Sequence, residues 1–309
     1  MRTRRSQSSG DPMSQGHRTV LLHEAVDSLD IQKNDVVVDG TLGGAGHSVE
    51  ILKHLGTHGT LIGFDADKEA IERSKIALEG AKAAVHFVNT NFRHLKTELE
   101  TRGLGRIDKA LFDLGWSSYQ LDAGRGFSFQ KDEPLSMAYA ADQALDAFEI
   151  VNQWGEQSIA DIIFGWGEER YSRRIAKGIV LAREKKPIRT SGELAEVVRS
   201  SVPAAYRFGR IHPATKTFQA LRIAVNDELG ALSEGLNAAW ELLNPGGRIA
   251  VISFHSIEDR IVKRQFVAWA ASENGIRITK KPIVAGEEEL RTNPRARSAK
   301  LRVVQKKSI

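Results

Sequence analysis

The sequence predicts an α/β protein, in which an open and mainly parallel sheet is interrupted by an inserted, mainly helical domain. Three observations support this prediction. Short apolar runs rich in β-branched residues alternate with helical patterns over the first hundred residues. The alternation stops between residues 115 and 214, where helical patterns occur without a convincing strand, and it then resumes to the C-terminus. Strand–helix–strand units of this kind form the right-handed crossovers of a parallel sheet.

Four strands and three helices are expected before the insertion. The helix over 68–78 should turn Ala70, Ile71 and Ile76 inward, because these residues share one helical face. A glycine-rich turn follows the first strand. The expected strands cover 36–39, 60–65, 85–88 and 107–113, and the expected helices cover 48–55, 68–78 and 92–100.

The insertion is expected to hold helices over 148–163, 168–184 and 191–201. One long helix over 217–243 should follow, since seven apolar residues fall on one face. The residues Asn244 to Gly247 (NPGG) end it, because proline and glycine do not continue a helix. The pattern is completed by strands over 248–254, 276–280 and 301–304 and by a helix over 257–271. The face of the long helix consists of Phe218, Leu221, Val225, Leu229, Leu232, Leu236 and Leu243.

These elements predict a domain plan with three parts. Residues 13–115 and 215–309 form one discontinuous sheet domain, and residues 116–214 form an inserted helical domain for substrate recognition. Residues 1–12 form a flexible N-terminal tail.

The composition excludes several classes of protein. The chain has 309 residues, of which 41% are hydrophobic, which is enough for a substantial core. It contains no cysteine, so disulfide frameworks, cysteine-ligated zinc, iron–sulfur clusters and thiolate nucleophiles are ruled out. The basic N-terminus lacks the apolar segment of a signal peptide, and no apolar run has the length of a membrane span. We therefore expect a cytoplasmic protein that does not enter a membrane.

The net charge of +5 is unevenly distributed. Residues 291–309 hold seven Lys or Arg and no acid, and residues 170–222 hold thirteen bases against three acids. Residues 113–167, in contrast, hold nine acids and two bases. Such asymmetry indicates a polyanionic partner bound by selected surfaces, although solvated surface charge explains it equally well.

The turn after the first strand indicates a cofactor site. Glycines between a strand and a helix let a ligand approach the backbone closely. The pattern G-x-G-x-x-G is incomplete, because Val49 stands where the third glycine would be. Asp65, at the end of the second strand, can accept both hydrogen bonds of a ribose diol. Together these features favour S-adenosylmethionine over NAD, and the alternative is a tight turn followed by a capping aspartate.

Two further strand ends carry polar residues. Asp113, at the end of the fourth strand, could accept a proton or hydrogen bond from a nucleophile, and Gln120 could bind the cofactor; the alternative is that Asp113 caps a turn. After the fifth strand, His255 precedes two carboxylates, which permits hydrolysis, but Ser256 fits a helix N-cap equally well. His47 and His255 lack a third ligand at metal spacing, so no metal is expected.

A basic stripe falls on the predicted helix at 168–184. Tyr171, Ile175 and Ile179 fall on the opposite face and should pack inward. Cations backed by a packing face suit phosphates, so RNA or DNA is the expected partner, with a solvated face as the alternative. The stripe comprises Arg170, Arg173, Arg174 and Lys177, and further cations that favour a nucleic acid are Arg207, Arg210, Lys216, Arg291, Arg295, Arg297, Lys300 and Arg302.

Several separate stretches together resemble the bacterial 16S rRNA cytosine-N4 methyltransferases (MraW type), over residues 17–302. The matching stretches include HRTVLLHE at 17–24, VDGTLGGAGHS at 38–48, RGFSF at 125–129, GEERYSRRIA at 167–176, HPATKTFQALRIAVN at 212–226, PGGRIAVISFHSIEDRIVK at 245–263 and NPRARSAKLR at 293–302.

The resemblance implies a Rossmann-like S-adenosylmethionine-dependent methyltransferase sheet. It also implies methylation of N4 of a cytidine in the decoding region of 16S rRNA, within the small ribosomal subunit. The alternatives are another RNA site or an inactive, RNA-binding assembly factor; the oligomeric state stays open between monomer and homodimer. The implied cofactor contacts are Ala45, Gly46, His47, Asp65, Phe92, Asp113 and Gln120, and substrate RNA would contact Arg170, Arg173, Arg174, Lys177, Lys216, His255, Arg295 and Arg297.

The chain departs from the family pattern in two places. Trp116 and Tyr119 stand where the family commonly has valine and proline. Ser136, Ala138 and Tyr139 replace an acid, an arginine and a methionine. We expect the second group to border the cleft on the side of the inserted domain and to bear on the target base rather than on the cofactor.

Overall fold

A computed structural model describes residues 18–115, 121, 124–140 and 143–308. In these residues a seven-stranded sheet has the order β3-β2-β1-β4-β5-β7-β6. All neighbours are parallel except around β7, which pairs antiparallel with both β5 and β6. The strands are β1 (Val36–Asp39), β2 (Thr60–Phe64), β3 (Ala84–Val88), β4 (Ile107–Asp113), β5 (Leu243–Ser253), β6 (Gly275–Arg277) and β7 (Lys300–Lys306).

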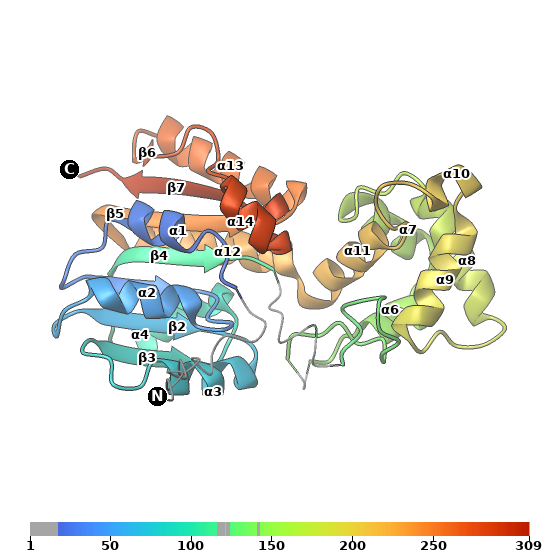
Figure 1. The fold of residues 1–309 in the computed structure, drawn as a ribbon, viewed down its shortest axis with the longest axis horizontal. Coiled ribbons are helices and arrows are strands. Elements are labelled where there is room, and N and C mark those ends of the chain that lie inside the picture. Colours follow the sequence, from blue (N-terminus) through green and yellow to red (C-terminus); the bar gives the residue numbers. More distant parts are fainter. Residues whose placement is uncertain (1–17, 116–120, 122–123, 141–142, 309) are drawn as a thin grey trace, which may run out of the picture.

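Helices cover both faces of this sheet (Figure 1), so both faces of its central strands are apolar. One face packs against α1 (Leu22–Leu29) and α2 (Gly46–His54), and the other packs against α4 (Leu95–Thr101), α12 (Glu228–Leu242) and α13 (Ser256–Ala271). The helix α3 (Lys68–Ala77) and the short elements η1 (Phe92–His94), α14 (Glu287–Thr292) and η2 (Pro294–Ser298) complete the sheet domain. This three-layer arrangement agrees with the predicted Rossmann-like fold.

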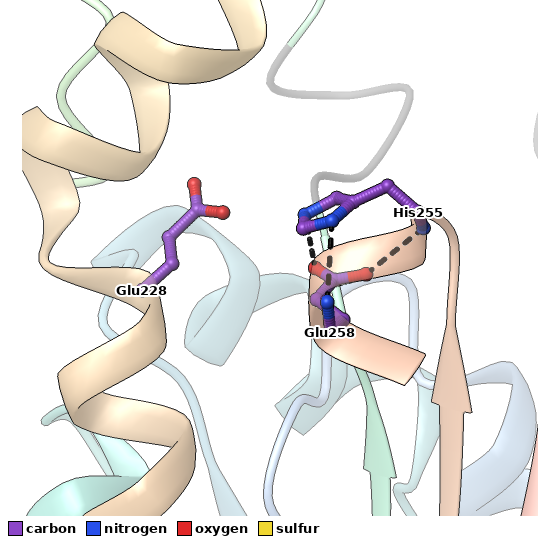
Figure 2. Close-up of side chains that lie close together, drawn as sticks. All are labelled: Glu228, His255 and Glu258. Carbon is purple, nitrogen blue, oxygen red and sulfur yellow. Dashed lines mark hydrogen bonds and ion pairs between the residues drawn. The ribbon is translucent and has the colours of Figure 1, made fainter. Parts of the chain in front are cut away.

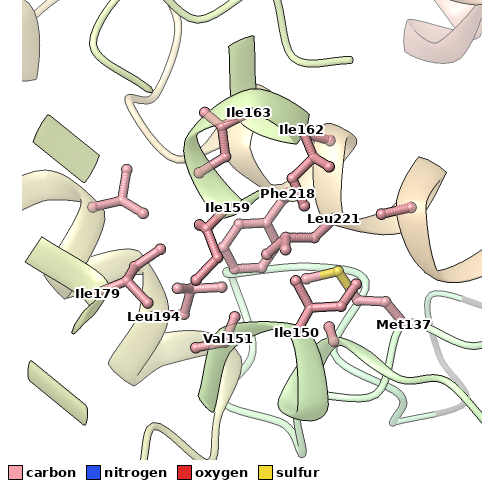
Figure 3. Packing of buried hydrophobic residues seen from close by; sticks show 14 of the residues in the cluster. Met137, Ile150, Val151, Ile159, Ile162, Ile163, Ile179, Leu194, Phe218 and Leu221 are labelled. Atoms are coloured by element: carbon pink, nitrogen blue, oxygen red, sulfur yellow. The ribbon is translucent and has the colours of Figure 1, made fainter. Parts of the chain in front are cut away.

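A separate helical unit lies beside the sheet (Figure 1) and has its own apolar core. Figure 3 shows this core, in which Ile150, Ile159, Leu194 and Phe218 from four helices meet. The inward positions of Ile175 and Ile179 are confirmed, since both are fully buried. The helices are α6 (Ala147–Gln153), α7 (Glu156–Gly165), α8 (Ser172–Arg183), α9 (Ser191–Ser201), α10 (Ala204–Arg207) and α11 (Thr215–Asn226).

The prediction of one helix over 217–243 is wrong. Asp227 has φ 44° and ψ 46°, a left-handed conformation that ends α11 and begins α12. The two halves of the apolar face therefore serve different cores, because Leu221 and Val225 pack in the helical unit whereas Leu232 and Leu236 pack under the sheet. The chain thus passes from the core of the helical unit to the core under the sheet at Asp227, whereas the expected domain boundary was residue 215.

Smaller differences have local causes. Ile76 is 76% exposed, while Ala70 and Ile71 are buried, so the buried face of α3 is narrower than predicted. The helix expected over 148–163 is divided between α6 and α7, where Trp154 and Gly155 have extended backbone angles. The helix expected from 168 begins at Ser172. No helix in the described part of the chain is long and apolar enough to cross a membrane.

Candidate active site

A cleft of about 1130 Å³, open space included, lies at the carboxyl ends of β1, β2 and β4. This edge contains the point between β1 and β4 at which the strand order reverses, which is where α/β sheets bind ligands. Residues 18–20, which precede α1, line it from a second side, and α12 lines it from a third. The helical unit contributes Tyr139, so the expectation that the second departure from the family pattern borders the cleft is confirmed for Tyr139, whereas Ser136 and Ala138 are not among the lining residues.

The turn after β1 brings its backbone close to neighbouring segments. Gly43 (φ 51°) and Ala45 (φ 61°) both adopt left-handed angles, and a Cβ on Gly46 would lie 1.8 Å from Thr19 Oγ1. Gly46 lines the cleft, whereas Ala45 is fully buried behind the turn and is not among the lining residues. Glycine is thus required at position 46 because the turn and Thr19 lie so close together, and Ala45 shapes the turn through its left-handed backbone.

Asp39, which the sequence analysis did not single out, anchors this turn. Its side chain is buried and accepts hydrogen bonds from Ser48 Oγ at 2.6 Å and from the Thr41 backbone N–H at 3.1 Å. Thr41 Oγ1 in turn accepts a bond from the backbone N–H of Asp113 at 2.7 Å. Burial raises the pKa of Asp39. The sequence signal was present, because Asp39 ends a β-branched strand directly before the glycines.

Asp65 lies where the sequence placed it, at the end of β2 and in the cleft. Its two carboxylate oxygens accept backbone N–H bonds from Gly43 and Asp67, each at 2.8 Å. Burial raises its pKa to about 6, although these two bonds act in the opposite direction. Each oxygen keeps a second lone pair, so the carboxylate can still accept from a diol.

Asp113 and His47 meet in the cleft. His47 Nδ1 lies 3.6 Å from Asp113 Oδ2, and His47 Nε2 lies 3.2 Å from the backbone oxygen of Val20. Asp113 Oδ1 is buried and has no hydrogen-bond partner. Burial raises the pKa of Asp113 to about 7, while the positive charge of Arg295 opposes the rise. Asp113 is therefore an acceptor whose ionisation is held near neutral pH.

The remaining predicted cofactor contacts are only partly described. Phe92 lines the cleft and packs edge-on against Phe112, with ring centroids 5.2 Å apart. Asn91, beside it, also lines the cleft and was not predicted. Gln120 lies outside the described residues, as do Trp116 and Tyr119.

A hydrogen-bond network around Glu228 borders the cleft on the side of the helical unit. Glu228 accepts two bonds from Arg222, at 2.7 and 2.8 Å, and one from the Tyr139 hydroxyl at 2.8 Å. Burial raises the pKa of Tyr139 well above its usual value, and the negative charge of Glu228 adds to the rise. Asn226 Oδ1 accepts a hydrogen bond from the backbone N–H of Tyr139 at 2.9 Å. These bonds join α11 and α12 to the loop before α6.

His255 is the N-cap of α13, which corrects the prediction that Ser256 caps this helix. His255 Nδ1 accepts from the backbone N–H of Glu258, and Glu258 Oε2 accepts from the backbone N–H of His255, each at 3.3 Å. Burial acts to raise the pKa of Glu258, but the contact with His255, the charge of Arg222 and the Phe254 backbone N–H together outweigh burial, so the pKa is lowered. Ser256, the first helical residue, donates to Glu168 at 2.6 Å.

Figure 2 shows Glu228 pointing toward His255 and Glu258, and ligand atoms of the three all lie within 4.8 Å of one another. This is a possible metal arrangement by distance. Both carboxylates, however, already accept bonds: Glu228 from Arg222, and Glu258 from the backbone of Phe254 and His255. A metal would have to displace these donors. The group therefore fits a capping and domain-bridging role better than a metal site.

The predicted RNA contacts lie in several places. Arg295 lines the cleft near Asp113, whereas Arg297 is exposed outside it. Lys216 donates to the backbone oxygen of Glu168 at 2.8 Å. Lys300 and Arg302 are bound by Asp259, at 3.1 and 2.7 Å, so the charges of these two basic residues are paired within the sheet domain. The stripe residues Arg170, Arg173, Arg174 and Lys177 are exposed on the helical unit.

The residues of the cleft fit an adenosyl cofactor that carries a positive sulfonium. Gly46 lets Thr19 pack against the turn that lines the cleft. Asp65 offers lone pairs to a ribose, and the buried Oδ1 of Asp113 offers an acceptor without a partner.

Comparison with known proteins gives one consistent result. The profile of the MraW methylase family matches residues 14–307. A protein of Clostridioides difficile (strain 630) named "Ribosomal RNA small subunit methyltransferase H" is 46% identical, over 94% of this chain and 98% of that protein. A protein of the same name from Brevibacillus brevis is 47% identical with the same coverage. A solved rRNA methylase from Streptococcus thermophilus covers 94% of this chain and 98% of its own, at 11% identity and a TM-score of 0.46.

Proposed function

Because the chain belongs to the MraW methylase family, we propose that it methylates N4 of a cytidine in the decoding region of 16S rRNA. Its cofactor is S-adenosylmethionine, as the glycine turn and Asp65 predicted. The names of the relatives, which match over nearly their whole length, support ribosomal RNA of the small subunit as the substrate. The exposed cations of the helical unit support an RNA partner independently of those names.

One observation supports an amine as the target: the buried, unpartnered oxygen of Asp113 in the cleft. The exocyclic amine of cytosine is a poor nucleophile, because its lone pair is delocalised into the ring. An acceptor beside N4 favours a pyramidal nitrogen and can take the proton that N4 loses once it carries the methyl group. The absence of cysteine agrees with this choice, since methylation at C5 commonly proceeds through a cysteine adduct.

S-adenosylmethionine, when bound, supplies a methyl group on a positively charged sulfur. We assign Asp65 to the ribose of the cofactor and Gly46, His47 and Phe92 to further cofactor contacts. Asp113 serves either as the acceptor of the N4 proton or as a cofactor contact. Ala45 and Gln120 remain predicted contacts on the basis of the resemblance.

The substrate must present an unstacked base, because N4 cannot reach the cleft from within a helix. Arg295, which lies in the cleft, is the predicted RNA contact nearest to Asp113. His255 and Lys216 lie at the contact between sheet domain and helical unit and are proposed to border the path of the RNA. Arg170, Arg173, Arg174, Lys177 and Arg297 are proposed to bind phosphates farther out.

The experiment is transfer of labelled methyl groups to small ribosomal subunits from cells that lack the modification, followed by nucleoside analysis. N4-methylated cytidine is the expected product. Any other methylated nucleoside would favour the alternative of another RNA site, and the absence of transfer despite cofactor binding would favour an assembly factor without activity. Either result would refute the proposal.

A further inference from the structure

The helical unit contains a second hollow, of about 740 Å³ with open space included, outside the cleft. It lies between the end of α7 and the beginning of α8. Its walls combine three arginines with two aromatic rings and one acid: Arg170, Arg173, Arg174, Phe164, Tyr171 and Asp161. We refer to it as the α7–α8 groove.

The cations of this groove are not neutralised by the protein. In the described part of the chain, Arg173 and Arg174 are exposed and have neither a carboxylate nor a hydrogen-bond partner. Other cations of the same helical unit do have such partners: Arg199 pairs with Glu196 at 2.8 Å and Lys186 pairs with Glu193 at 2.8 Å. Adjacent unpaired cations repel each other, so this surface is suited to an anion that comes from outside.

The third arginine is held in a fixed position. The Arg170 guanidinium lies 4.8 Å from the centre of the Tyr171 ring and 5.2 Å from that of Tyr206. The buried Glu169 fixes both tyrosines, since it accepts from the Tyr171 backbone N–H at 2.9 Å and from the Tyr206 hydroxyl at 2.5 Å. A guanidinium held between aromatic faces loses little side-chain entropy on binding a ligand.

Phe164 gives the groove an exposed aromatic wall. Its side chain is 66% exposed, although Ile159, Ile162 and Ile163 of the same helix are buried in the core. Asp161 lies one turn earlier and accepts a bond from Gln157 at 2.7 Å. An exposed ring beside unpaired arginines is the combination that single-stranded nucleic acids recognise, because bases stack on the ring while cations bind the phosphates.

A side-chain contact between the two parts of the protein connects residues near the groove to residues near the cleft. Glu168, two residues before Arg170, binds Arg260 at 2.5 Å and Ser256 at 2.6 Å. Ser256 in turn stands two residues before Glu258, which lines the cleft. Each of these two-residue segments spans at most about 7 Å, so two short segments and one side-chain contact connect the groove to the cleft.

We propose that the α7–α8 groove binds an unpaired nucleotide of the RNA substrate, with its base stacked on Phe164 and its phosphate held by Arg173 and Arg174. This inference rests on the proposed function, because it assigns a second contact to the same substrate. It predicts that the protein prefers a single strand to a duplex, since a paired base cannot stack on Phe164.

The test measures RNA binding by the full-length protein through fluorescence anisotropy. The first probe is a fluorescein-labelled, twelve-nucleotide RNA single strand of mixed sequence. The second probe is a labelled hairpin in which the same twelve nucleotides are paired with their complement. Phe164→Ala should weaken binding of the single strand by about fivefold or more, which corresponds to the loss of one stacked base. Phe164→Leu should weaken binding of the single strand similarly, whereas Phe164→Trp should bind it as the wild type does. The reason is that stacking requires an aromatic ring, which leucine does not supply.

The cations have a separate readout. Arg174→Ala should reduce the slope of log K against log salt concentration by about 0.7, the value for one phosphate of a single strand, whereas Phe164→Ala should leave that slope unchanged. Lys185→Ala is the matched control, because Lys185 is exposed and follows the far end of α8, roughly 16 Å from Arg174 along the helix. It should bind the single strand as the wild type does.

Three results would overturn the inference. One is wild-type affinity of Phe164→Ala for the single strand, and another is an equal loss on the hairpin duplex. The third is that a labelled twelve-residue oligoglutamate binds with the same dependence on Phe164 and Arg174, which would indicate an acidic protein segment as the occupant. If the wild type methylates cytidine while Phe164→Ala binds RNA normally, the inference fails alone. If no methylated cytidine forms while Phe164→Ala weakens RNA binding, only the proposed function fails.

Discussion

Replacing Asp113 with asparagine should stabilise the protein at alkaline pH while it reduces methyl transfer. The carboxylate lies in the cleft with one buried oxygen unpartnered, and burial raises its pKa from 3.8 to about 7. Asparagine has nearly the same shape but no charge, so the variant does not bury an ionised group. A group used as an acceptor should lower the rate by about 100-fold or more when it is lost.

The size of the stabilisation follows from the shift in pKa. A rise of about 3 pKa units corresponds to ~4 kcal/mol, and since the side chain is 26% exposed we expect ~2–4 kcal/mol. Between pH 3.8 and 7 the folded state binds the proton of Asp113 more tightly than the unfolded state does. The free energy of unfolding of the wild type therefore falls as pH rises through this window. Asp113→Asn lacks this dependence.

The assay is urea unfolding of the protein without cofactor at pH 5 and pH 8.5. The variant should exceed the wild type in free energy of unfolding at pH 8.5, and the difference should be less than half as large at pH 5. Asp259→Asn is the control for which the opposite effect is expected. Burial acts to raise the pKa of Asp259, but the bonds to Arg302 and Lys300 outweigh burial, so the pKa is lowered. The Asp259→Asn variant should therefore lose stability at pH 8.5. A difference for Asp113→Asn that is independent of pH, or a loss of stability at pH 8.5, would refute the reasoning.

Three further predictions concern the cleft and its borders. Asp65→Ala should weaken S-adenosylmethionine binding by ~1–3 kcal/mol in calorimetry, and unchanged affinity would contradict the assignment. The affinity of the wild type should fall as pH is lowered through about 6, because protonation of Asp65 removes a hydrogen-bond acceptor. Gly46→Ala should greatly reduce that affinity through the clash with Thr19, and Thr19→Ala in the same chain should recover part of it. Arg222→Met should cost ~3–5 kcal/mol in urea unfolding, because it leaves Glu228, whose side chain is only 11% exposed, without its cation. Adding Glu228→Leu should restore most of the stability, and a cost below ~1 kcal/mol would argue against the pair.

The elements of the sheet were largely predictable because each carries a local signal. The β-branched run at Val36–Asp39 forms β1, and the pattern at Ile107–Asp113 forms β4 with the predicted bounds. The break at Asp227 was not predictable from periodicity, because the apolar face continues unchanged through it. Its cause is tertiary, since the two halves of the face are buried in different cores.

The site was predictable to the extent that its residues end strands. Asp65 follows β2 and Asp113 is the last residue of β4, and parallel strands bring such ends together at one edge. Glu228 and Thr19 were missed, because they reach the cleft from segments far apart in the chain, whereas Tyr139 was expected there only from its departure from the family pattern. His255 was singled out, but the sequence did not distinguish a reacting histidine from the N-cap that it forms with Glu258.

The sequence by itself thus determined the α/β class, the order of the strands along the chain, the cofactor turn and the family. It did so because hydrophobic period, glycine positions and motif order are local properties of the chain. The tertiary structure decided which charges are paired within the fold and which are left unpaired. Asp259 takes up Lys300 and Arg302, whereas Arg173 and Arg174 have no partner among the described residues. Pairing depends on which acids come within a few ångströms, and only the packed structure fixes those distances.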